Sequence, residues 1–334
     1  MRKIYILTTL LFQLLILSFA CSNPFIGDDE RGIVQPPTPV YPEIDENPIF
    51  HPDGQRIVYQ HNAITEVWEG GPYDINPDSM GLWISDINGD NPKMLLEGRS
   101  IDADFNPDGT WIVYELNAQI YKAPFTGDSI DTSQVIQLTP GGRNFFPDWS
   151  PDGEWIAYDR SISDGYGPYG IWVMKNDGSG KKHIYPYSRA PSWHPDCKRL
   201  FTIKSVDVTA SQSSYIFIVR YPFEDTPPDT LDIVITSNSV RYVKVSPDGQ
   251  HILFQSSPGG GNVSIYVMNI NGSNLNRLSD GYDPSWSPDG NQIVFIRKSP
   301  KVMWGLGTIW IMDKDGNNLK QITFVPENIS FINR

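Results

Sequence analysis

The sequence is poor in cysteine: its 334 residues include only Cys21 and Cys197. Because Cys21 lies in the N-terminal apolar segment discussed below, we expect no disulfide within the folded chain. Stability must therefore come from a hydrophobic core, and a chain of this length can bury one.

Basic residues are also scarce, with 26 Lys and Arg against 39 Asp and Glu, a net charge of −13. If a leader carrying Arg2 and Lys3 is removed, 24 against 39 leaves −15. A surface of this sign repels phosphate backbones and anionic headgroups. We expect no nucleic-acid partner and no peripheral binding to anionic membranes.

The common enzyme signatures are missing or incomplete. Neither G-x-S-x-G nor H-E-x-x-H occurs. Gly165–Gly170 spells G-x-G-x-x-G, but Pro168 stands where a nucleotide-binding helix should begin, so a glycine-rich loop is the better interpretation. The runs Asp86–Asn91 and Asp313–Asn318 lack the distal glutamate of a calcium loop. We expect no catalytic motif, no cofactor and no metal ion.

One motif, by contrast, occurs six times. Its copies are FHPDGQRIVY (50–59), FNPDGTWIVY (105–114), WSPDGEWIAY (149–158), WHPDCKRLF (193–201), VSPDGQHILF (245–254) and WSPDGNQIVF (286–295). The turn prolines at 52, 107, 151, 195, 247 and 288 are thus 55, 44, 44, 52 and 41 residues apart. Such a period indicates a propeller or another repeat array. His51 and His194 replace the serine of the turn in copies one and four, on opposite sides of such a ring, so they cannot share a metal ion.

Each copy predicts a hairpin. In Ser287–Gly290 the proline fixes φ, and the glycine accepts a positive φ at the end of a type I turn. A second hairpin with an Asn-Gly or Asp-Gly centre follows most copies, at 82–96, 171–185, 265–279 and 309–323. Two hairpins supply four antiparallel strands. We therefore predict an all-β fold, a six-bladed β-propeller of four-stranded antiparallel blades, over residues 46–334.

The end of the chain leaves an alternative open. Glu327–Phe331 echoes Glu46–Phe50, as though a seventh repeat were starting. Only eleven residues follow Thr323. We expect a tail strand that helps to close the ring against the first blade.

The pattern W-S-P-D-G followed by I-x-V-M-x-x-D-G resembles the TolB-type, WD-like propeller repeat, which also occurs in the propellers of prolyl oligopeptidase relatives. The resemblance covers about residues 46–323. It implies a six-bladed propeller alone. We expect no counterpart of the α/β domain that precedes the propeller in TolB, so the resemblance does not imply a role in the Tol pathway.

The N-terminus predicts a lipid anchor. A basic start precedes the apolar run Ile4–Ala20, and Leu17–Cys21 resembles a bacterial lipobox, in which Cys21 becomes the acylated first residue. An uncleaved anchor helix is the alternative. Ser22 stands where an inner-membrane retention signal would have Asp, so the common sorting rule favours the outer membrane.

The predicted organisation is therefore a lipoprotein signal peptide at 1–20, an acidic, proline-rich tether at 21–45 and the propeller. Lipid would be the only contact with the membrane. The protein would be anchored to the bacterial outer membrane, on its periplasmic or its surface side.

Irregular segments between the predicted strands indicate a binding face. The insertions 60–81, 160–170 and 297–307 carry the aromatic residues Trp68, Tyr73, Tyr166, Tyr169 and Trp304. Aromatic loops on a rigid scaffold are typical of recognition surfaces. The alternative is that these side chains fold down and seal the ring.

Four arginines precede the turn prolines of copies two to five by six or eight residues: Arg99, Arg143, Arg189 and Arg241. We expect them near the mouth of the central channel, where they could form an anion site. The alternative pairs them with nearby carboxylates such as Asp102, Asp104 and Asp148.

These features favour a non-catalytic lipoprotein of the cell envelope that binds an envelope protein or a glycan. The alternative is a glycan lyase or hydrolase that uses carboxylates and arginines at the channel mouth. A propeller fold does not decide between them.

We predict that Cys21 carries lipid. Cys21→Ser should release the protein from membranes, because the acyl chains that hold it there would all be attached through this residue. Fractionation of cells that produce each form, with mass spectrometry of the N-terminal peptide, measures this. An unmodified Cys21, or a variant that stays with the membrane, would contradict the prediction.

Overall fold

The computed structural model describes residues 43–67, 73–75, 77–98, 102–161, 165–208, 211–220, 229–231, 240–257, 262–298 and 307–324. The chain divides into two compact units, Met1–Pro39 and Val40–Arg334, and all described residues belong to the second. The predicted signal peptide and most of the tether lie outside the described residues. None of the helices in the described ranges has the length and apolar character needed to cross a membrane.

The strands form six antiparallel sheets, numbered here in chain order. Sheet 1 has the order β1 (Glu43–Phe50), β2 (Arg56–Val67), β4 (Gly81–Asp86) and β5 (Lys93–Glu97), with β3 (Tyr73–Ile75) paired to β2. Sheet 2 has the order β6 (Ala103–Phe105), β7 (Trp111–Leu116), β8 (Gln119–Thr126) and β10 (Ile136–Gln137), with β9 (Ser129–Ile130) paired to β8. Two 3-10 turns, η1 (Pro77–Ser79) and η2 (Thr132–Gln134), lie in the connections of these sheets.

The other four sheets have four strands each. Sheet 3 contains β11 (Asn144–Trp149), β12 (Trp155–Arg160), β13 (Gly170–Lys175) and β14 (Lys182–Pro186). Sheet 4 contains β15 (Ser188–Trp193), β16 (Arg199–Val208), β17 (Ser211–Arg220) and β18 (Asp229–Leu231). Sheet 5 contains β19 (Arg241–Val245), β20 (His251–Ser256), β21 (Ser264–Asn269) and β22 (Asn276–Asp280). Sheet 6 contains β23 (Tyr282–Trp286), β24 (Gln292–Lys298), β25 (Gly307–Asp313) and β26 (Lys320–Gln321).

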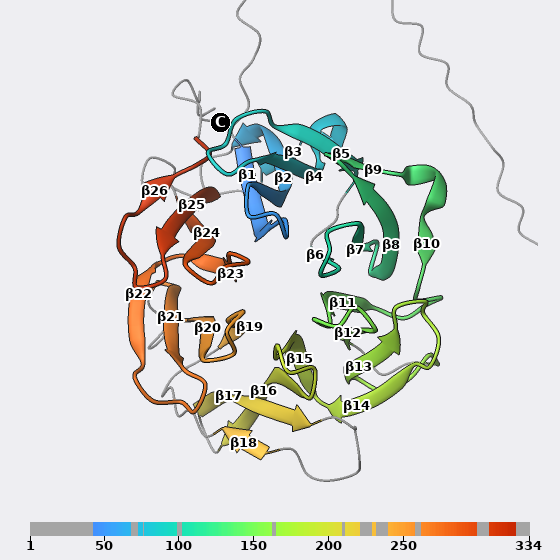
Figure 1. The fold of residues 1–334 in the computed structure, drawn as a ribbon, viewed down its shortest axis with the longest axis vertical. Helices are drawn as coiled ribbons and strands as arrows, with labels where there is room; N and C mark the ends of the chain where they lie inside the picture. Colours follow the sequence, from blue (N-terminus) through green and yellow to red (C-terminus); the bar gives the residue numbers. More distant parts are fainter. Residues whose placement is uncertain are drawn as a thin grey trace, which may run out of the picture. The chain divides into compact units, whose positions relative to one another are not determined.

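Within the second unit the sheets follow one another around a ring, and the first strand of each sheet lies innermost (Figure 1). The predicted all-β propeller with four-stranded antiparallel blades is confirmed at this level. Sheets 1 and 2 depart from it by one strand each. The reason is local: β2 is 12 residues long and β8 is 8, so each pairs with a short added strand as well as with the strands of its blade.

The motif turns form as their residues dictate. In sheet 6 the Ser287 hydroxyl donates to Asp289 Oδ1 at 2.5 Å and accepts from the Gln292 N–H at 2.8 Å. Gly290 has φ +68° and donates its N–H to the Ser287 carbonyl at 2.9 Å. Since each polar group of the turn finds a partner, the motif fixes the hairpin without help from other sheets.

Each turn also packs against the turn of the next sheet. A Cβ added to the turn glycine would approach the preceding turn: Gly54 meets Pro288, Gly109 meets His51, Gly153 meets Pro107, Gly249 meets His194 and Gly290 meets Pro247. In sheet 4 this position is occupied by Cys197, which adopts φ 56°. The contact of Gly54 with Pro288 joins sheet 6 to sheet 1.

The core lies between neighbouring sheets. Trp149 is 7 % exposed and packs with Ile120 of sheet 2 and Ile156 of sheet 3. Trp193 lies between sheets 3 and 4, and Trp286 between sheets 5 and 6. The three tryptophans of the motif thus pack between neighbouring sheets.

Asp45 connects the first and last sheets. Its side chain is 1 % exposed, lies 2.8 Å from His61 Nδ1 and accepts from the Thr323 hydroxyl at 2.5 Å. Phe50 and Ile57 of sheet 1 pack with Ile309 of sheet 6 in the same joint. The predicted tail strand at 327–331 lies outside the described residues.

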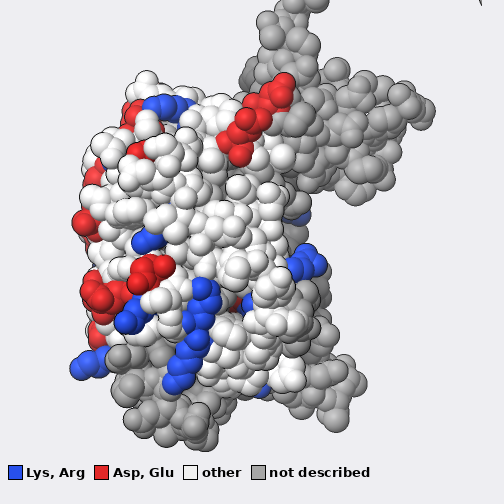
Figure 2. Space-filling view, turned by 90° about the vertical axis from the view of Figure 1, so that its right-hand side faces the viewer, with Lys and Arg blue, Asp and Glu red and all other residues white. Residues whose placement is uncertain are grey.

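Charged pairs on the outside contribute less to these joints. In Figure 2 acidic side chains lie mainly along the left edge of the described surface, with one acidic stretch at the top. Basic side chains also lie in its centre and at its right edge, and uncharged residues cover most of the rest. Lys93 and Asp128, from sheets 1 and 2, form such a pair at 3.0 Å, with side chains 47 % and 61 % exposed. Exposed pairs add little to stability, so the joints depend mainly on buried contacts.

We predict that Gly249→Ala destabilises the protein more than Gly127→Ala. Both glycines have a positive φ, +68° and +66°, which costs an alanine about 1 kcal/mol. A Cβ at Gly249 would also lie 2.7 Å from His194 Nε2, whereas none of the described atoms lies within 4 Å of one at Gly127. The crowding should reduce the free energy of unfolding by a further ~1–3 kcal/mol.

Denaturant unfolding of both variants measures the difference. The excess cost at Gly249 should fall in a His194→Ser background, since the smaller side chain leaves room for the methyl group. Equal losses for the two glycine variants, or an excess that survives His194→Ser, would contradict the packing of the turns described above.

Candidate functional site

A cavity of about 480 Å³, partly open to solvent, is lined by all six inner strands or the residue that leads into them. It therefore lies on the axis of the ring. The lining residues are Asn47, Pro48, Ile49, Asp102, Ala103, Phe146, Pro147, Ala190, Pro191, Tyr242, Val243, Lys244, Asp283, Pro284 and Ser285. They occupy positions three to five residues before the turn proline of each repeat.

A bulge in the inner strands shapes this cavity. The pairing of β1, β11, β15, β19 and β23 with the next strand shifts register at the same place in each. The residue at the bulge has a positive φ of 50–53° in all five strands: Asn47, Phe146, Ala190, Tyr242 and Asp283. Bulges redirect side chains, and here the redirected residues line the axis. Proline follows in four of the five strands, where it leaves no N–H without a partner.

Side chains two residues after the bulge position join consecutive sheets. Asp104 Oδ2 accepts the backbone N–H of Trp149 at 2.7 Å, and Asp148 Oδ2 accepts that of Trp193 at 2.8 Å. Ser192 accepts the N–H of Val245 at 3.2 Å in the same way. A side chain three residues before the turn proline thus satisfies an inner-strand amide of the next sheet.

Lys244 occupies this position in sheet 5 and behaves differently. Its Nζ donates to Asp148 Oδ1 at 2.7 Å, so it joins sheets 5 and 3, which are not consecutive. Burial opposes the charge of Lys244, but Asp148 and Asp104 outweigh it and raise the pKa of the ammonium group. Burial and the neighbouring Asp148 raise the pKa of Asp104 to about 7.

Two further carboxylates face the cavity. Burial, together with Asp283, Glu115 and Asp159, raises the pKa of Asp102 well above its usual value. Burial and the nearby Glu46 raise the pKa of Asp283 to about 7. Within the described ranges, no group of three or more His, Cys, Asp or Glu side chains is arranged to hold a metal ion.

Aromatic rings form another part of the wall. Phe146 of sheet 3 and Tyr242 of sheet 5 meet edge to face with centroids 5.4 Å apart, although their sheets are not consecutive. Burial, with Asp283 and Asp102 nearby, raises the pKa of the Tyr242 phenol well above its usual value. Tyr242 is thus neutral in the physiological range and offers both a ring and a hydroxyl to the cavity.

The predicted arginines do not all occupy the same position of the repeat. Arg189 and Arg241 pair at equivalent places in sheets 4 and 5, but in sheet 3 that place is taken by Phe145. Arg143 lies two residues earlier, with its guanidinium 5.9 Å from the Phe145 ring. All three arginines are exposed, and Arg99 lies outside the described residues. The six- and eight-residue spacings are thus two different positions of the repeat, and Arg143 does not share the position of Arg189 and Arg241.

The alternative, in which the arginines pair with nearby carboxylates, agrees with the structure only in part. The Arg189 charge acts on Asp159 and the Arg241 charge acts on Asp283, in each case lowering a pKa that burial raises. Asp148, by contrast, pairs with Lys244.

Of the predicted aromatic residues, Tyr166 and Tyr169 are described with their side chains. Tyr166 is 59 % exposed, and Tyr169 is partly exposed. Tyr73 lies in β3, but its side chain is not among those described, and Trp68 and Trp304 lie outside the described residues. The structure adds Tyr187, 64 % exposed, whose ring meets that of Tyr169 at 6.0 Å. Tyr187 directly precedes the inner strand β15 and does not belong to an insertion, so a prediction based on aromatic insertions did not include it.

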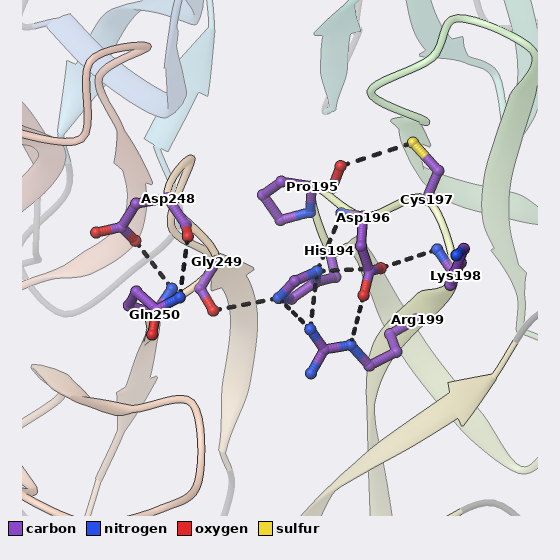
Figure 3. Close-up of polar contacts among 9 residues, drawn as sticks. All are labelled: His194, Pro195, Asp196, Cys197, Lys198, Arg199, Asp248, Gly249 and Gln250. Atoms are coloured by element: carbon purple, nitrogen blue, oxygen red, sulfur yellow. Dashed lines mark hydrogen bonds and ion pairs between the residues drawn. The ribbon is translucent and has the colours of Figure 1, made fainter.

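The two turn histidines join sheets. His194 Nε2 lies 3.1 Å from the Gly249 carbonyl of sheet 5, and its ring contacts Arg199, which also donates to Asp196 (Figure 3). His51, Asp53 and Arg56 repeat this arrangement in sheet 1. These histidines therefore pack between neighbouring turns and are not among the residues that line the axial cavity.

Sequence reasoning named Asp102 only as a partner for arginines, and missed Tyr242, Lys244 and Asp283 as cavity residues. A signal was present. When the six copies are aligned on the turn proline, the position five residues earlier reads Asn47, Asp102, Phe146, Ala190, Tyr242 and Asp283. A repeat position that varies so widely within a fixed frame indicates a surface that turn chemistry does not determine.

No family model matches the chain. Among solved structures, it is similar to TolB from Acinetobacter baumannii (21 % identity, TM-score 0.62), with 82 % of this chain and 64 % of that one covered. A putative TolB from Agrobacterium tumefaciens (20 %, TM-score 0.58) matches over 70 % of this chain and 84 % of its own. The oligogalacturonate lyase from Vibrio parahaemolyticus (11 %, TM-score 0.52) matches over 83 % and 92 %.

The chain thus spans less than two thirds of the first of these proteins. At such identities the likeness supports the propeller fold and carries no activity with it.

We predict that Asp102→Asn stabilises the protein by more at pH 8 than at pH 5. The raised pKa means that the folded state keeps a proton on Asp102 which the unfolded chain has already released. Stability is therefore lost as the pH rises from the usual aspartate range through the raised pKa. Asparagine removes the charge, so the gain at pH 8 should be about 1 kcal/mol or more.

Denaturant unfolding at the two pH values measures the gain, with Glu154→Gln, an exposed carboxylate of the β11–β12 turn, as the control. The control should show no such dependence on pH. An equal effect of Asp102→Asn at both pH values would show that its charge is already compensated.

Proposed function

We propose that this protein is a non-catalytic binding scaffold of the bacterial cell envelope. In this proposal the six sheets are six blades of one ring, Cys21 carries the lipid that anchors the protein to the outer membrane, and one face of the ring binds an envelope protein or a glycan. The observation that carries the proposal is the pair of tyrosines, Tyr166 and Tyr187, held exposed at 59 % and 64 % on that face.

The topology defines the binding face. The motif turns and the Asn-Gly or Asp-Gly turns lie at one end of the strands. The links between blades, and those between the second and third strands of a blade, lie at the other end. Tyr187 lies in the link between β14 and β15, and Tyr166 in the link between β12 and β13. Both therefore lie on the face of the links, at the end of the strands where the inner strands enter the ring.

Neighbouring residues hold the two rings in place. The Tyr187 ring meets that of Tyr169, and its backbone N–H donates to the Tyr169 carbonyl at 3.3 Å. Lys204 Nζ lies 6.0 Å from the Tyr187 centroid, and the Arg160 guanidinium lies 5.8 Å from that of Tyr166. Exposed rings that are already ordered lose little conformational entropy when a partner binds.

A glycine supports the position of Tyr166. A Cβ added to Gly141 would overlap the Tyr166 ring, so the ring lies directly on the backbone of the β10–β11 link. Exposed tyrosines that are held beside basic groups are suited to stack on a sugar ring or to anchor a peptide side chain. This arrangement favours recognition over a purely structural role.

The second candidate is a glycan lyase or hydrolase. It is favoured by the buried carboxylates of the axial cavity, whose raised pKa values are of the kind found in acid–base catalysis. The similarity to an oligogalacturonate lyase is one of fold and does not strengthen this candidate above the first.

We predict that Tyr166→Ala and Tyr187→Ala each weaken partner binding about fivefold, equivalent to about 1 kcal/mol, with stability changed by no more than about 0.5 kcal/mol. Leu275→Ala is the matched control, because Leu275 is 47 % exposed in the β21–β22 turn, on the opposite face. The partner is first recovered from envelope extract on wild-type protein, and its affinity for each variant is then measured.

Equal affinity for wild type and both tyrosine variants would remove these residues from the binding face. If the wild-type protein turns over a glycan and Asp102→Asn or Asp283→Asn abolishes this activity, the protein is an enzyme and the scaffold proposal is wrong.

A further inference from the structure

The axial cavity contains a carboxylate oxygen that the fold leaves without a partner. Asp102 is 7 % exposed and lines the cavity, and its buried Oδ2 atom has no hydrogen-bond partner among the residues that the structure describes. A buried carboxylate oxygen in this state costs stability. Such a cost is retained at a position that binds something.

The charges around Asp102 leave negative charge in excess. Asp283, Glu115 and Asp159 all act on it unfavourably, and Lys244 is the cation that acts in its favour. Lys244, however, gives its hydrogen bond to Asp148. The wall of the cavity near Asp102 therefore favours a positive group that can donate a hydrogen bond.

The rest of the wall is apolar or aromatic. Prolines from sheets 1, 3, 4 and 6 line it, together with the rings of Phe146 and Tyr242. Aromatic rings and carboxylates together are a common environment for organic cations, because a ring face attracts positive charge and apolar walls accept a hydrocarbon stem. The cavity is partly open to solvent, so a small molecule can enter it from outside.

We propose that the cavity binds an organic cation, a primary ammonium group on an apolar stem, with Asp102 Oδ2 accepting its hydrogen bond, Asp283 as a second counter-charge and the Phe146 and Tyr242 rings beside the stem. The ammonium group supplies the donor that Asp102 lacks, and its stem covers the apolar wall. This site lies on the axis and does not depend on the proposed role of the exposed tyrosines.

Binding exchanges a proton. Burial and the neighbouring carboxylates raise the pKa of Asp102 well above its usual value, so its protonated form persists to higher pH while no cation is bound. The ammonium group enters already protonated, and an Asp102 carboxyl that still carries its proton releases it to solvent and becomes the carboxylate with which the cation pairs. Affinity therefore rises from pH 5.5 to pH 8. The titratable and charged groups that face this pair of carboxylates are Glu46, Glu115, Asp159, Arg241, Tyr242 and Lys244.

Isothermal titration of the full chain in detergent with n-butylammonium chloride tests the proposal, with the heat of injection into detergent alone subtracted. At pH 8 we expect millimolar binding, at least tenfold weaker binding of the neutral isostere n-butanol, and release of protons detected from the dependence of the heat on the buffer. Asp102→Asn should weaken the binding of n-butylammonium at least tenfold, while Glu154→Gln should leave it unchanged.

Three results would overturn the proposal. The first is unchanged binding to Asp102→Asn, and the second is equal binding of n-butanol, which would make the cavity merely apolar. The third is binding of calcium chloride without binding of n-butylammonium, which would make it a metal site. If Asp102→Asn does not fold by circular dichroism, Asp283→Asn and the comparison of n-butylammonium with n-butanol on wild type decide: no loss with Asp283→Asn and no preference for the cation would reject the site.

Discussion

The joint between consecutive sheets is the interaction on which the rest of this structure depends. A four-stranded sheet of this size buries little by itself and is stable only against its neighbours. The joint repeats two contacts: a turn glycine packs on the preceding turn, and a side chain three residues before the turn proline accepts an amide of the next inner strand. The first contact comes from the ten-residue motif that forms the hairpin, and the second comes from the residue directly before that motif. This short stretch of sequence therefore sets both the hairpin of one sheet and its attachment to the next.

The axial cavity follows from the same geometry. Inner strands have one edge that does not pair within the sheet, and their bulges direct one residue of each toward the axis. Side chains there are close to one another even when their sheets are not consecutive, as with Lys244 and Asp148 or Phe146 and Tyr242. Charge in this space is poorly screened, so substitutions at one position of the repeat have large electrostatic effects while the surrounding joints stay unchanged.

Turn chemistry made much of the fold predictable, because its contacts are local. Pro288 and Gly290 fix a hairpin with atoms from their own repeat, and Trp286 has to pack against the adjacent sheet. The site was less predictable. Asp283 and Asn47 occupy one repeat position, but the direction of their side chains depends on a bulge in pairing that turn residues do not encode. The positions of the predicted arginines show the same dependence: Arg189 pairs within its inner strand, whereas Arg143 precedes β11. The Tyr187 ring is contacted by Tyr169 of another segment, and a contact of this kind is not encoded in the local sequence around Tyr187.

Each described sheet consists of strands that follow one another in the chain, so one repeat of sequence is also one sheet. The first and last sheets meet through Asp45, Thr323 and an apolar layer, a joint like the others except that no peptide bond crosses it. A ring built in this way can gain or lose a whole repeat through duplication or deletion of one segment of the gene, because no sheet has to be shared between distant parts of the chain. The segment that such a duplication would copy is therefore also the segment that folds as one sheet.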